Sequence, residues 1–555
     1  MSGRWRGGGE PETWRANPFH RMRLGDNGPD RITLFGNDPR LGDIARGREL
    51  MRGVWRIAAE RLAGDYDIPW DRPTPSKHFL ARLHSFSWLA DLSALGPDSH
   101  ARISTLIETW VRQYGEWDEF AWDVTLVAER LFAWLCHGRR AFEFGDPAMR
   151  PQVMRSIGRH AKLLMIAQNE LDDHPAELIK AGAALIIAGV SGFPEGDRLR
   201  EQGEEILIEI IAKQFLPDGM HQSRAPETLA EAACDIVTAC GAMRTAGYDI
   251  PNTVKDALPR MANMLRFLRL GDGGLGCFHG GSEGSPGALH RVLELIGGQV
   301  RGFRYATHAA YQRLQQGDVT LLFDVGAAPP PLFGERAHAG ALAFEMSCGE
   351  ERLIVNVGAA RELEPEGRAA ARTTNGHSTL VLADALSCSL ERTRYGARFE
   401  GPALDDVRRS EDEDGVTVQG RHDGYKAQFG LLHRRYLFVD TAGRNVRGID
   451  ELIRPMKLKT APPRGEIAFV ARFHLHPSVR AAMVENQIVQ LETPSGARWR
   501  LRTDAPHVAL QPSAYWGGKT LPQETMQIVL SGAADPMGHG LGPPNRIRWA
   551  LARGE

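Results

Sequence analysis

The feature of this sequence that most constrains its fold is a single change of hydrophobic period near residue 300. Between about 43 and 300, apolar residues recur at spacings of three and four, which is the period of an amphipathic helix. From about 305 onward, alternating and β-branched runs dominate instead, which is the period of a strand. A single change of this kind predicts a helical domain followed by a β domain.

The first half divides into helical segments separated by turn-forming sequences such as Gly96-Pro97 and residues 216–219, Leu-Pro-Asp-Gly. Helices joined by short loops pair as antiparallel hairpins, and stacked hairpins can close into a ring or arc. We therefore predict an (α/α) toroid of helical hairpins. The predicted helices cover residues 44–62, 79–95, 101–114, 124–137, 153–171, 177–190, 199–215, 226–246 and 253–268.

The second half consists of short strands separated by Gly, Asp and Pro, which predicts a large antiparallel β-sandwich. Three regions follow: an irregular N-terminal arm at 1–42, the toroid at 43–300, and the sandwich at 301–555. The clearest predicted strands are 319–324, 352–356, 378–382, 416–419, 435–440, 467–472, 488–492 and 526–530.

Composition excludes several classes of protein. Lys and Arg number 67 against 69 Asp and Glu, a net charge of −2, so the chain has no electrostatic footprint for nucleic acid. No apolar run is long enough to predict a membrane span. No secretory signal follows the first residues, which predicts a cytoplasmic protein. The six cysteines form no CxxC pair, so we expect free, mostly buried thiols.

A series of short strings is the next informative feature of the sequence. The strings are residues 83–89, 121–130 with Trp134, 214–221 with Arg224 and Pro226, 265–275, 337–345, 352–356 and 374–380. In this order they resemble the heparinase II/III-like family, in which a toroid and a β-sandwich supply the two walls of a sugar cleft. The resemblance spans about 75–550 and implies a polysaccharide lyase that cleaves an acidic, uronate-containing glycan by β-elimination. It also implies the periplasm as an alternative compartment.

Such a lyase must neutralise the uronate carboxylate, remove the adjacent proton and protonate the leaving oxygen. At the positions that carry this chemistry in the family, the sequence departs from the pattern. Thr228 stands where the family has its catalytic Tyr, and a Thr hydroxyl cannot replace a phenol in acid–base work. Glu177 lies at the family's Asn–His pair and would repel a uronate. In the HxHxD motif, Arg336 replaces the first His and Gly340 replaces the Asp.

Other residues are candidates for the same tasks. Arg224, Arg336 and Arg372 are available to neutralise a carboxylate, and His221, His338 or His377 to shuttle a proton. Trp at helical spacing is more often a core residue than a sugar platform, so both roles stay open for Trp122. The predicted catalytic residues are His221, Arg224, Arg336 and His377, and the predicted substrate-binding residues are Trp122, Arg130, Glu177 and Arg372.

The resemblance also implies a zinc site at His338, Asn356 and His377. Two imidazoles remain, but the family's carboxylate has become an amide, which is a poorer zinc ligand. The alternatives are a hydrogen-bonded cluster that braces the sandwich, or three unrelated positions. Zinc is therefore a possible cofactor on the resemblance alone.

Three functions stay open from the sequence. The favoured one is a polysaccharide lyase acting on an acidic polysaccharide or oligosaccharide. The alternative is a catalytically altered or inactive glycan-binding protein of the cell envelope, because fold does not guarantee activity. A hydrolase using Asp172, Asp173 and Glu177 ranks last, because no partner carboxylate is positioned by the sequence.

Overall fold

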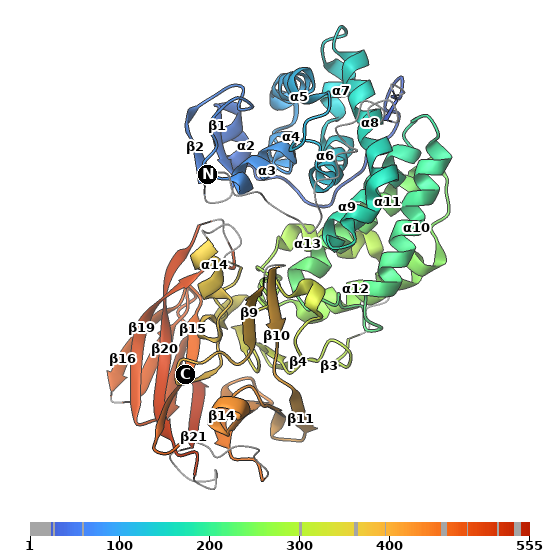
Figure 1. The fold of residues 1–555 in the computed structure, drawn as a ribbon. Helices are drawn as coiled ribbons and strands as arrows, with labels where there is room; N and C mark the ends of the chain where they lie inside the picture. Colours follow the sequence, from blue (N-terminus) through green and yellow to red (C-terminus); the bar gives the residue numbers. More distant parts are fainter. Residues whose placement is uncertain are drawn as a thin grey trace. The chain divides into compact units, whose positions relative to one another are not determined.

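A computed structural model describes residues 24–25, 28–57, 60–298, 302–359, 365–393, 396–456, 463–485, 487–518, 521–537 and 545–554. The chain forms two compact units. Unit 1 comprises Met1–Phe215, Ala230–Pro259 and Gly287–Gly298, and unit 2 comprises Leu216–Leu229, Arg260–Pro286 and Gln299–Glu555. Helices and one short hairpin make up unit 1, whereas antiparallel sheets make up most of unit 2 (Figure 1). Two segments that precede residue 300 thus belong with the sheets.

The helices follow the apolar period, and several begin at a capping side chain. Asp43 accepts hydrogen bonds from the amides of Ala45 and Arg46, and Asp123 accepts one from the amide of Thr125. The helices are α2 (Ile44–Met51), α3 (Lys77–His84), α4 (Leu89–Ser93), α5 (His100–Tyr114), α6 (Val124–His137), α7 (Arg139–Phe144), α8 (Arg150–Ala167), α9 (Pro175–Gly189), α10 (Gly196–Gln214), α11 (Pro226–Ala246), α12 (Asn252–Leu268) and α13 (Pro286–Ile296). No described helix is both long and apolar enough to span a membrane.

Two of the predicted helices are wrong in their extent. The helix predicted at 44–62 ends at Met51, and an antiparallel hairpin follows, β1 (Val54–Ile57) with β2 (Glu60–Asp65). Gly53, at φ 78°, ends the helix, because only glycine adopts that conformation readily. The helix predicted at 79–95 is broken into α3 and α4 at Phe86, whose φ is 58°.

The described part of the N-terminal arm lies on the helices of unit 1. The amide of Thr33 donates to the Ser191 carbonyl at 3.0 Å, and the amide of Gly36 donates to the Leu135 carbonyl at 3.1 Å. Arg40 pairs with Asp38, Glu231 and Asp235. Backbone and charge thus fix this segment, while residues 1–23 and 26–27 lie outside the described residues.

Unit 2 holds two large antiparallel sheets in the described part of the chain. One runs in the order β11-β12-β13-β14-β21-β18-β17-β16, and the other β19-β20-β15-β7-β6-β5-β4-β3, with β8 paired to β15. Buried side chains from both sheets form one core that includes Phe344, Phe473, Leu437 and Trp549, so the sheets pack as a sandwich.

The strands are β3 (Tyr305–Ala306), β4 (Tyr311–Gln316), β5 (Val319–Asp324), β6 (Phe344–Cys348), β7 (Glu351–Val355), β8 (Leu380–Leu382), β9 (Ser389–Thr393), β10 (Gly396–Glu400), β11 (Leu404–Glu411), β12 (Gly415–His422), β13 (Leu432–Asp440), β14 (Asn445–Ile453), β15 (Ile467–Leu475), β16 (Arg480–Glu485), β17 (Ile488–Glu492), β18 (Arg498–Thr503), β19 (His507–Tyr515), β20 (Gln523–Ala534) and β21 (Arg546–Arg553). Two short helices, α14 (Pro365–Ala371) and α15 (Lys426–Phe429), lie between strands. All six cysteines are free thiols, as the sequence predicts.

Candidate functional site

Arg224 lies in the segment 216–229, which joins α10 to α11 and belongs to unit 2. Asp218 fixes this segment to the sheet, because its Oδ2 accepts hydrogen bonds from the amides of His308 and Ala309 at 2.9 and 2.8 Å. Arg224 itself has φ 56°, a left-handed conformation that is costly for a long side chain. The strained backbone directs the guanidinium toward the end of β5.

The Arg224 guanidinium is buried, and each of its three nitrogens has a partner. Its Nε donates to the Ala309 carbonyl at 3.0 Å, one terminal nitrogen donates to the Ala327 carbonyl at 2.8 Å, and the other pairs with Asp324. Burial would lower the pKa of Arg224, but the Asp324 carboxylate raises it above its usual value. Burial would likewise raise the pKa of the Asp324 carboxyl, but Arg224 and His279 hold it below its usual value. The candidate cation therefore already has a counter-ion.

His279 completes this centre, and sequence analysis did not select it as a site residue. Its Nε2 lies 3.1 Å from Asp324 Oδ2 and 3.0 Å from a terminal nitrogen of Arg224, so this ring nitrogen contacts both members of the ion pair. Burial is the main reason that the pKa of His279 is lowered. Its buried Nδ1 has no hydrogen-bond partner in the described part of the chain. The only available signal was the following Gly280-Gly281 pair, since His279 takes the left-handed φ of 48°.

Behind His279 lies a small cavity within unit 2. Its volume is about 10 Å³, and His279, Asp324, His338, Ser387 and Cys388 are among its lining residues. Such a space holds about one water molecule. The cavity beside His279 is therefore too small to admit a sugar ring.

His221 is buried and turned into its own loop. Its Nδ1 accepts a hydrogen bond from the Ser223 amide at 3.1 Å, and its ring packs edge-on against Phe333 with 5.0 Å between the ring centres. Burial, with the nearby charge of Arg336, lowers the pKa of His221 to about 3. The imidazole is neutral at physiological pH, and its accessible surface is almost nil.

The structure brings together two of the three predicted metal ligands. His338 Nδ1 and His377 Nε2 lie 3.3 Å apart, and His377 Nδ1 donates to the Thr373 carbonyl at 2.8 Å. Burial lowers the pKa of His377 to about 4. Gly340, at the family's Asp position, lies against the same ring, because a Cβ there would be 2.7 Å from His377 Cδ2.

Asn356, the third predicted ligand, is occupied elsewhere. Its Nδ2 donates to the Cys277 carbonyl at 3.2 Å, and its Oδ1 accepts from the Ser378 amide at 3.0 Å. A structural zinc site needs about four donors, and no group of three or more His, Cys, Asp or Glu residues in the described ranges is placed to hold a metal ion. The donor set does not fit zinc, and the two imidazoles fit a hydrogen-bonded pair.

The two remaining predicted arginines differ in exposure. Arg336 is exposed. Arg372 is half-buried, and it donates to the carbonyls of Ala337 and Gly334 at 3.0 and 2.6 Å. Arg372 thereby braces the loop that carries His338, whereas Arg336 presents its charge at the surface.

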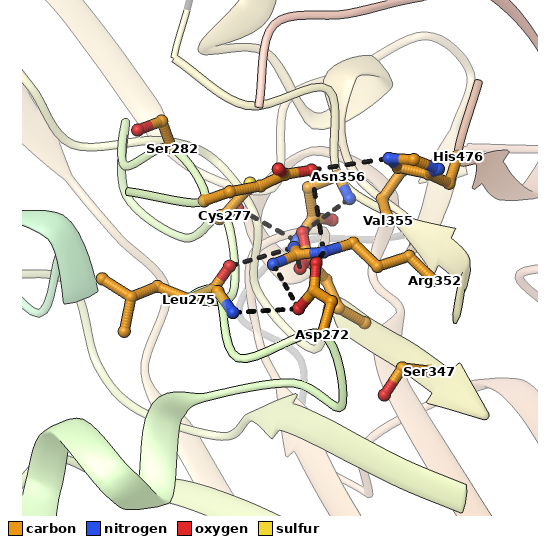
Figure 2. Close-up of polar contacts among 12 residues, drawn as sticks. Asp272, Leu275, Cys277, Ser282, Ser347, Arg352, Val355, Asn356 and His476 are labelled. Atoms are coloured by element: carbon orange, nitrogen blue, oxygen red, sulfur yellow. Dashed lines mark hydrogen bonds and ion pairs between the residues drawn. The ribbon is translucent and has the colours of Figure 1, made fainter. Parts of the chain in front are cut away.

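A second buried cluster holds the glycine-rich loop at 270–283 against the sheet (Figure 2). Arg352 on β7 donates to Asp272 Oδ2 at 2.7 Å and to the Leu275 carbonyl at 3.0 Å. Tyr515 donates to Glu283 at the far end of the loop, at 2.5 Å. Both contacts fix the loop from which His279 projects, so they position that side chain.

Glu345 lies within the same cluster and is completely buried. Burial raises the pKa of its carboxyl to about 7, even though Arg352 lies 3.7 Å away. Its Oε1 accepts from the Asn356 amide at 2.8 Å, while its Oε2 has no hydrogen-bond partner among the described residues. No signal in the sequence linked Glu345 to the loop.

Three predicted substrate-binding residues lie in unit 1. Trp122 is buried and donates to the Tyr114 carbonyl at 2.7 Å. Arg130 is also buried; it donates to His160 Nε2 at 2.7 Å and to the carbonyls of His84 and Ala121. Burial lowers the pKa of Arg130 to about 9. Both side chains are core residues, while Glu177 is half-buried in the first turn of α9.

Residues 298–550 match the family described as "Heparinase II/III-like, C-terminal". FtsZ-localized protein C of Caulobacter vibrioides (strain NA1000 / CB15N) is 31% identical over 556 residues, which cover 98% of this chain and 94% of that protein. The chain belongs to the heparinase II/III-like family.

Solved structures show the fold of this heparinase II/III-like protein. A crystal structure of heparinase III matches with a TM-score of 0.71 at 12% identity, covering 98% of this chain and 91% of that one. A heparan sulfate lyase HepC mutant from Pedobacter heparinus matches with a TM-score of 0.62 at 15% identity, covering 97% and 87%. The fold is a helical toroid followed by an antiparallel β-sandwich, as predicted from the sequence.

Proposed function

We propose that this heparinase II/III-like protein binds an acidic glycan without cleaving it, and that it acts at cell division together with FtsZ. The observation that carries the proposal is the pairing of Arg224 with Asp324. β-Elimination needs a cation that meets the substrate carboxylate. A buried arginine with its own carboxylate has little charge left to offer.

The proton-transfer groups support the same conclusion. Thr228 offers a hydroxyl in place of the family's phenol, and its side chain is half-buried at the start of α11. His221 is buried and its Nδ1 accepts from Ser223. His279 faces a cavity of about 10 Å³, too small for a sugar. None of the three is placed to act as a general base on a polysaccharide.

Glycan binding is proposed from the fold that the chain shares with heparinase III and a heparan sulfate lyase, and from exposed cationic groups such as Arg336. Association with FtsZ is proposed from the name of the Caulobacter relative, which aligns along almost the whole chain. Glycan binding and association with FtsZ both require the fold but not proton transfer. A protein that has the lyase fold without the catalytic groups could therefore do both.

One assay tests the enzymatic part of the proposal. The purified full chain is incubated with a panel of acidic glycans, and the absorbance of unsaturated uronate products is followed beside heparinase III as a positive control. We expect no product, together with measurable retention of at least one glycan on the immobilised protein. Product formation on any glycan overturns the proposal, and so does the absence of binding to all of them.

A second experiment tests the association with FtsZ. A fluorescent fusion of the full chain is imaged in cells that also carry labelled FtsZ. We expect the two signals to coincide at the division site; a uniform distribution at native expression contradicts the association. The same images decide between the cytoplasmic and the periplasmic predictions.

A polysaccharide lyase with altered residues is the second candidate, and one observation favours it. His279 and Asp324 form a histidine–carboxylate pair whose remaining ring nitrogen has no partner in the described structure. A pair of this kind can act as a general base once substrate reaches it. If a glycan product appears in the assay above, His279→Gln is expected to abolish it.

A further inference from the structure

A larger cavity lies elsewhere in unit 2, beside the C-terminal end of α12. Its volume is about 480 Å³, and Arg266, Phe303, Arg304, Arg313, Arg409 and Glu411 are among its lining residues. Small-molecule sites usually occupy about 300–1,000 Å³. This cavity therefore has the size of a site for a small ligand, and we name it the α12–β4 cavity.

The α12–β4 cavity carries an excess of positive charge. Four arginines line it, and the single acidic residue among its lining, Glu411, already pairs with two of them, Arg304 and Arg409. The other two make different contacts. Arg266 donates to Asn263 Oδ1 at 3.4 Å. Arg313 donates to the carbonyls of Phe267 and Arg269 and, through its Nε, to Gln315 Oε1 at 3.1 Å. Neither has a carboxylate partner within the described ranges.

The charge of Arg313 lies in an unfavourable environment. Its guanidinium is half-buried, and burial together with the charge of Arg269 lowers the pKa of Arg313 to about 10. Two like charges are thus held near each other without a neutralising group. An anion in the cavity would offset both the desolvation and the repulsion, and arginine forks are suited to phosphate, sulfate and carboxylate.

The remaining lining indicates which kind of anion fits. Phe303 is half-buried and stacks on Phe267, with 4.6 Å between ring centres and 7° between planes. An aromatic face held in this way suits the apolar face of a sugar ring. The side chains of Asn263, Gln315 and Gln316 add neutral donors and acceptors for hydroxyl groups.

The α12–β4 cavity is separate from the Arg224 centre. Arg224 contacts Asp324, which pairs with Tyr311 at the open end of the β4–β5 hairpin. Gln316 lies at the turn end, where it pairs with Val319. The residues that line the cavity include none of Arg224, His279, Tyr311 and Asp324. A ligand in the cavity is therefore distinct from a glycan at the candidate catalytic residues.

We propose that the α12–β4 cavity binds a small anionic carbohydrate, whose sugar ring lies on Phe303 and whose charged group is held by Arg266 and Arg313. The chemistry is shared by two sources, a sugar phosphate and a sulfated fragment of an acidic glycan. The proposal does not depend on the function proposed above, because it uses a different site.

Calorimetric titration of the full chain at low salt tests the proposal with three probes. These are glucose 6-phosphate, a sulfated heparin disaccharide and uncharged glucose. We expect at least one anionic sugar to bind and glucose not to bind. Arg266→Gln should weaken the binding by about tenfold, since a charge-assisted hydrogen bond is lost. Arg502→Gln, which removes an exposed arginine on β18 outside the cavity, should leave it unchanged.

Each outcome of the titration identifies a different ligand or contradicts the proposal. Binding of the phosphate alone identifies a phosphorylated ligand, and binding of the disaccharide alone identifies a glycan fragment. If neither binds, or if Arg266→Gln and Arg502→Gln have the same affinity, the proposal is wrong. Arg304→Gln serves as a second variant, because the Arg304 side chain is 73% exposed and its loss should not impair folding. It should also weaken the binding.

Discussion

Two centres in unit 2 are built from the same three groups but in different surroundings. The loop centre consists of Arg224, Asp324 and His279, and the sheet centre consists of Arg435, Asp450 and His433. Each buries an arginine, a carboxylate and an imidazole that bonds to the carboxylate. Because the chemistry is the same, any difference between them comes from the backbone that supports it.

The sheet centre lies on regular strands, and its hydrogen bonds are complete. Asp450 on β14 accepts from Arg435 Nε at 2.7 Å and from Trp549 Nε1 at 3.2 Å, and it lies 2.9 Å from His433 Nε2. His433 Nδ1 lies 3.1 Å from His422 Nε2, and His422 Nδ1 accepts from a backbone amide at 3.1 Å. Each ring nitrogen therefore has a partner.

The loop centre is strained and incomplete. Arg224 and His279 both take left-handed backbone conformations, and His279 Nδ1 is buried without a partner in the described chain. A cavity of about 10 Å³ adjoins it. Strain and unsatisfied polar groups concentrate at functional sites. The two centres therefore differ in their support: the loop centre combines strained backbone with an unpartnered ring nitrogen, whereas every ring nitrogen of the sheet centre is bonded.

Removing the carboxylate should give the largest difference between the two centres. Asp450→Asn leaves Arg435 buried without a counter-ion and should lower the free energy of unfolding by about 3–5 kcal/mol. Asp324→Asn should cost less, about 1–3 kcal/mol, because water can enter the adjoining cavity. Urea denaturation of the two variants checks this order. Equal losses would contradict the distinction between the centres.

The stability of the protein should fall in acid, because the sheet centre buries a neutral histidine. Burial holds the pKa of His422 well below its usual value, while an unfolded histidine has a pKa of about 6.5. Below that pH the unfolded chain takes up a proton that the folded chain does not, so stability falls as the pH falls. At pH 5 the loss is about 2 kcal/mol for one such histidine.

His422→Gln removes this titration and keeps an amide that can donate to His433. The loss of unfolding free energy between pH 7 and pH 5 should therefore shrink by about 2 kcal/mol relative to the parent protein. His279→Gln is the matched variant in the loop centre and should change this pH dependence less. An unchanged dependence in His422→Gln would show that the imidazole is already charged when folded.

At neutral pH, His279→Gln should have a small effect on stability. One hydrogen bond to Asp324 is at stake, worth about 0.5–1.5 kcal/mol, and the unsatisfied Nδ1 is removed at the same time. The midpoint of thermal unfolding should drop by only a few degrees, as expected from a loss near 1 kcal/mol. A collapse of folding would make the loop centre as structural as the sheet centre.

Restoring the missing phenol should have the smallest effect of all. We expect Thr228→Tyr to yield no unsaturated uronate product, because Asp324 still neutralises Arg224. The glycan absorbance assay checks this outcome, with heparinase III as the positive control. Activity in Thr228→Tyr would show that the phenol alone was lacking and that the loop centre is still competent.

Much of the fold follows from local pattern. The predicted helices 124–137 and 226–246 and the predicted strands 319–324 and 488–492 have the bounds seen in the structure. Periodicity succeeds there because one face of each element meets the core. It fails at residues 44–62, where a single turn residue, Gly53, overrides an apolar pattern that continues through the hairpin.

The candidate site was less predictable, because its contacts join residues far apart in the chain. Arg224 was selected from its motif, but its partner Asp324 lies 100 residues away and looked like an ordinary strand end. His279 was not predicted as a site residue, since spacing alone cannot show a bond to a distant carboxylate. The pairing that removes the free charge of Arg224 is therefore visible only in three dimensions.

The clamp on the glycine-rich loop has a consequence for the order in which this protein is made. Asp272 can pair with Arg352 only once the chain is 80 residues longer. Glu283 can accept its hydrogen bond from Tyr515 only after 232 further residues have been synthesised. Until then, the apolar side chains of Leu275, Cys277 and Phe278 have no finished core to enter. A crossover at residue 300 would therefore divide unit 2, because Asp272 and Glu283 would come from one parent and Arg352 and Tyr515 from the other.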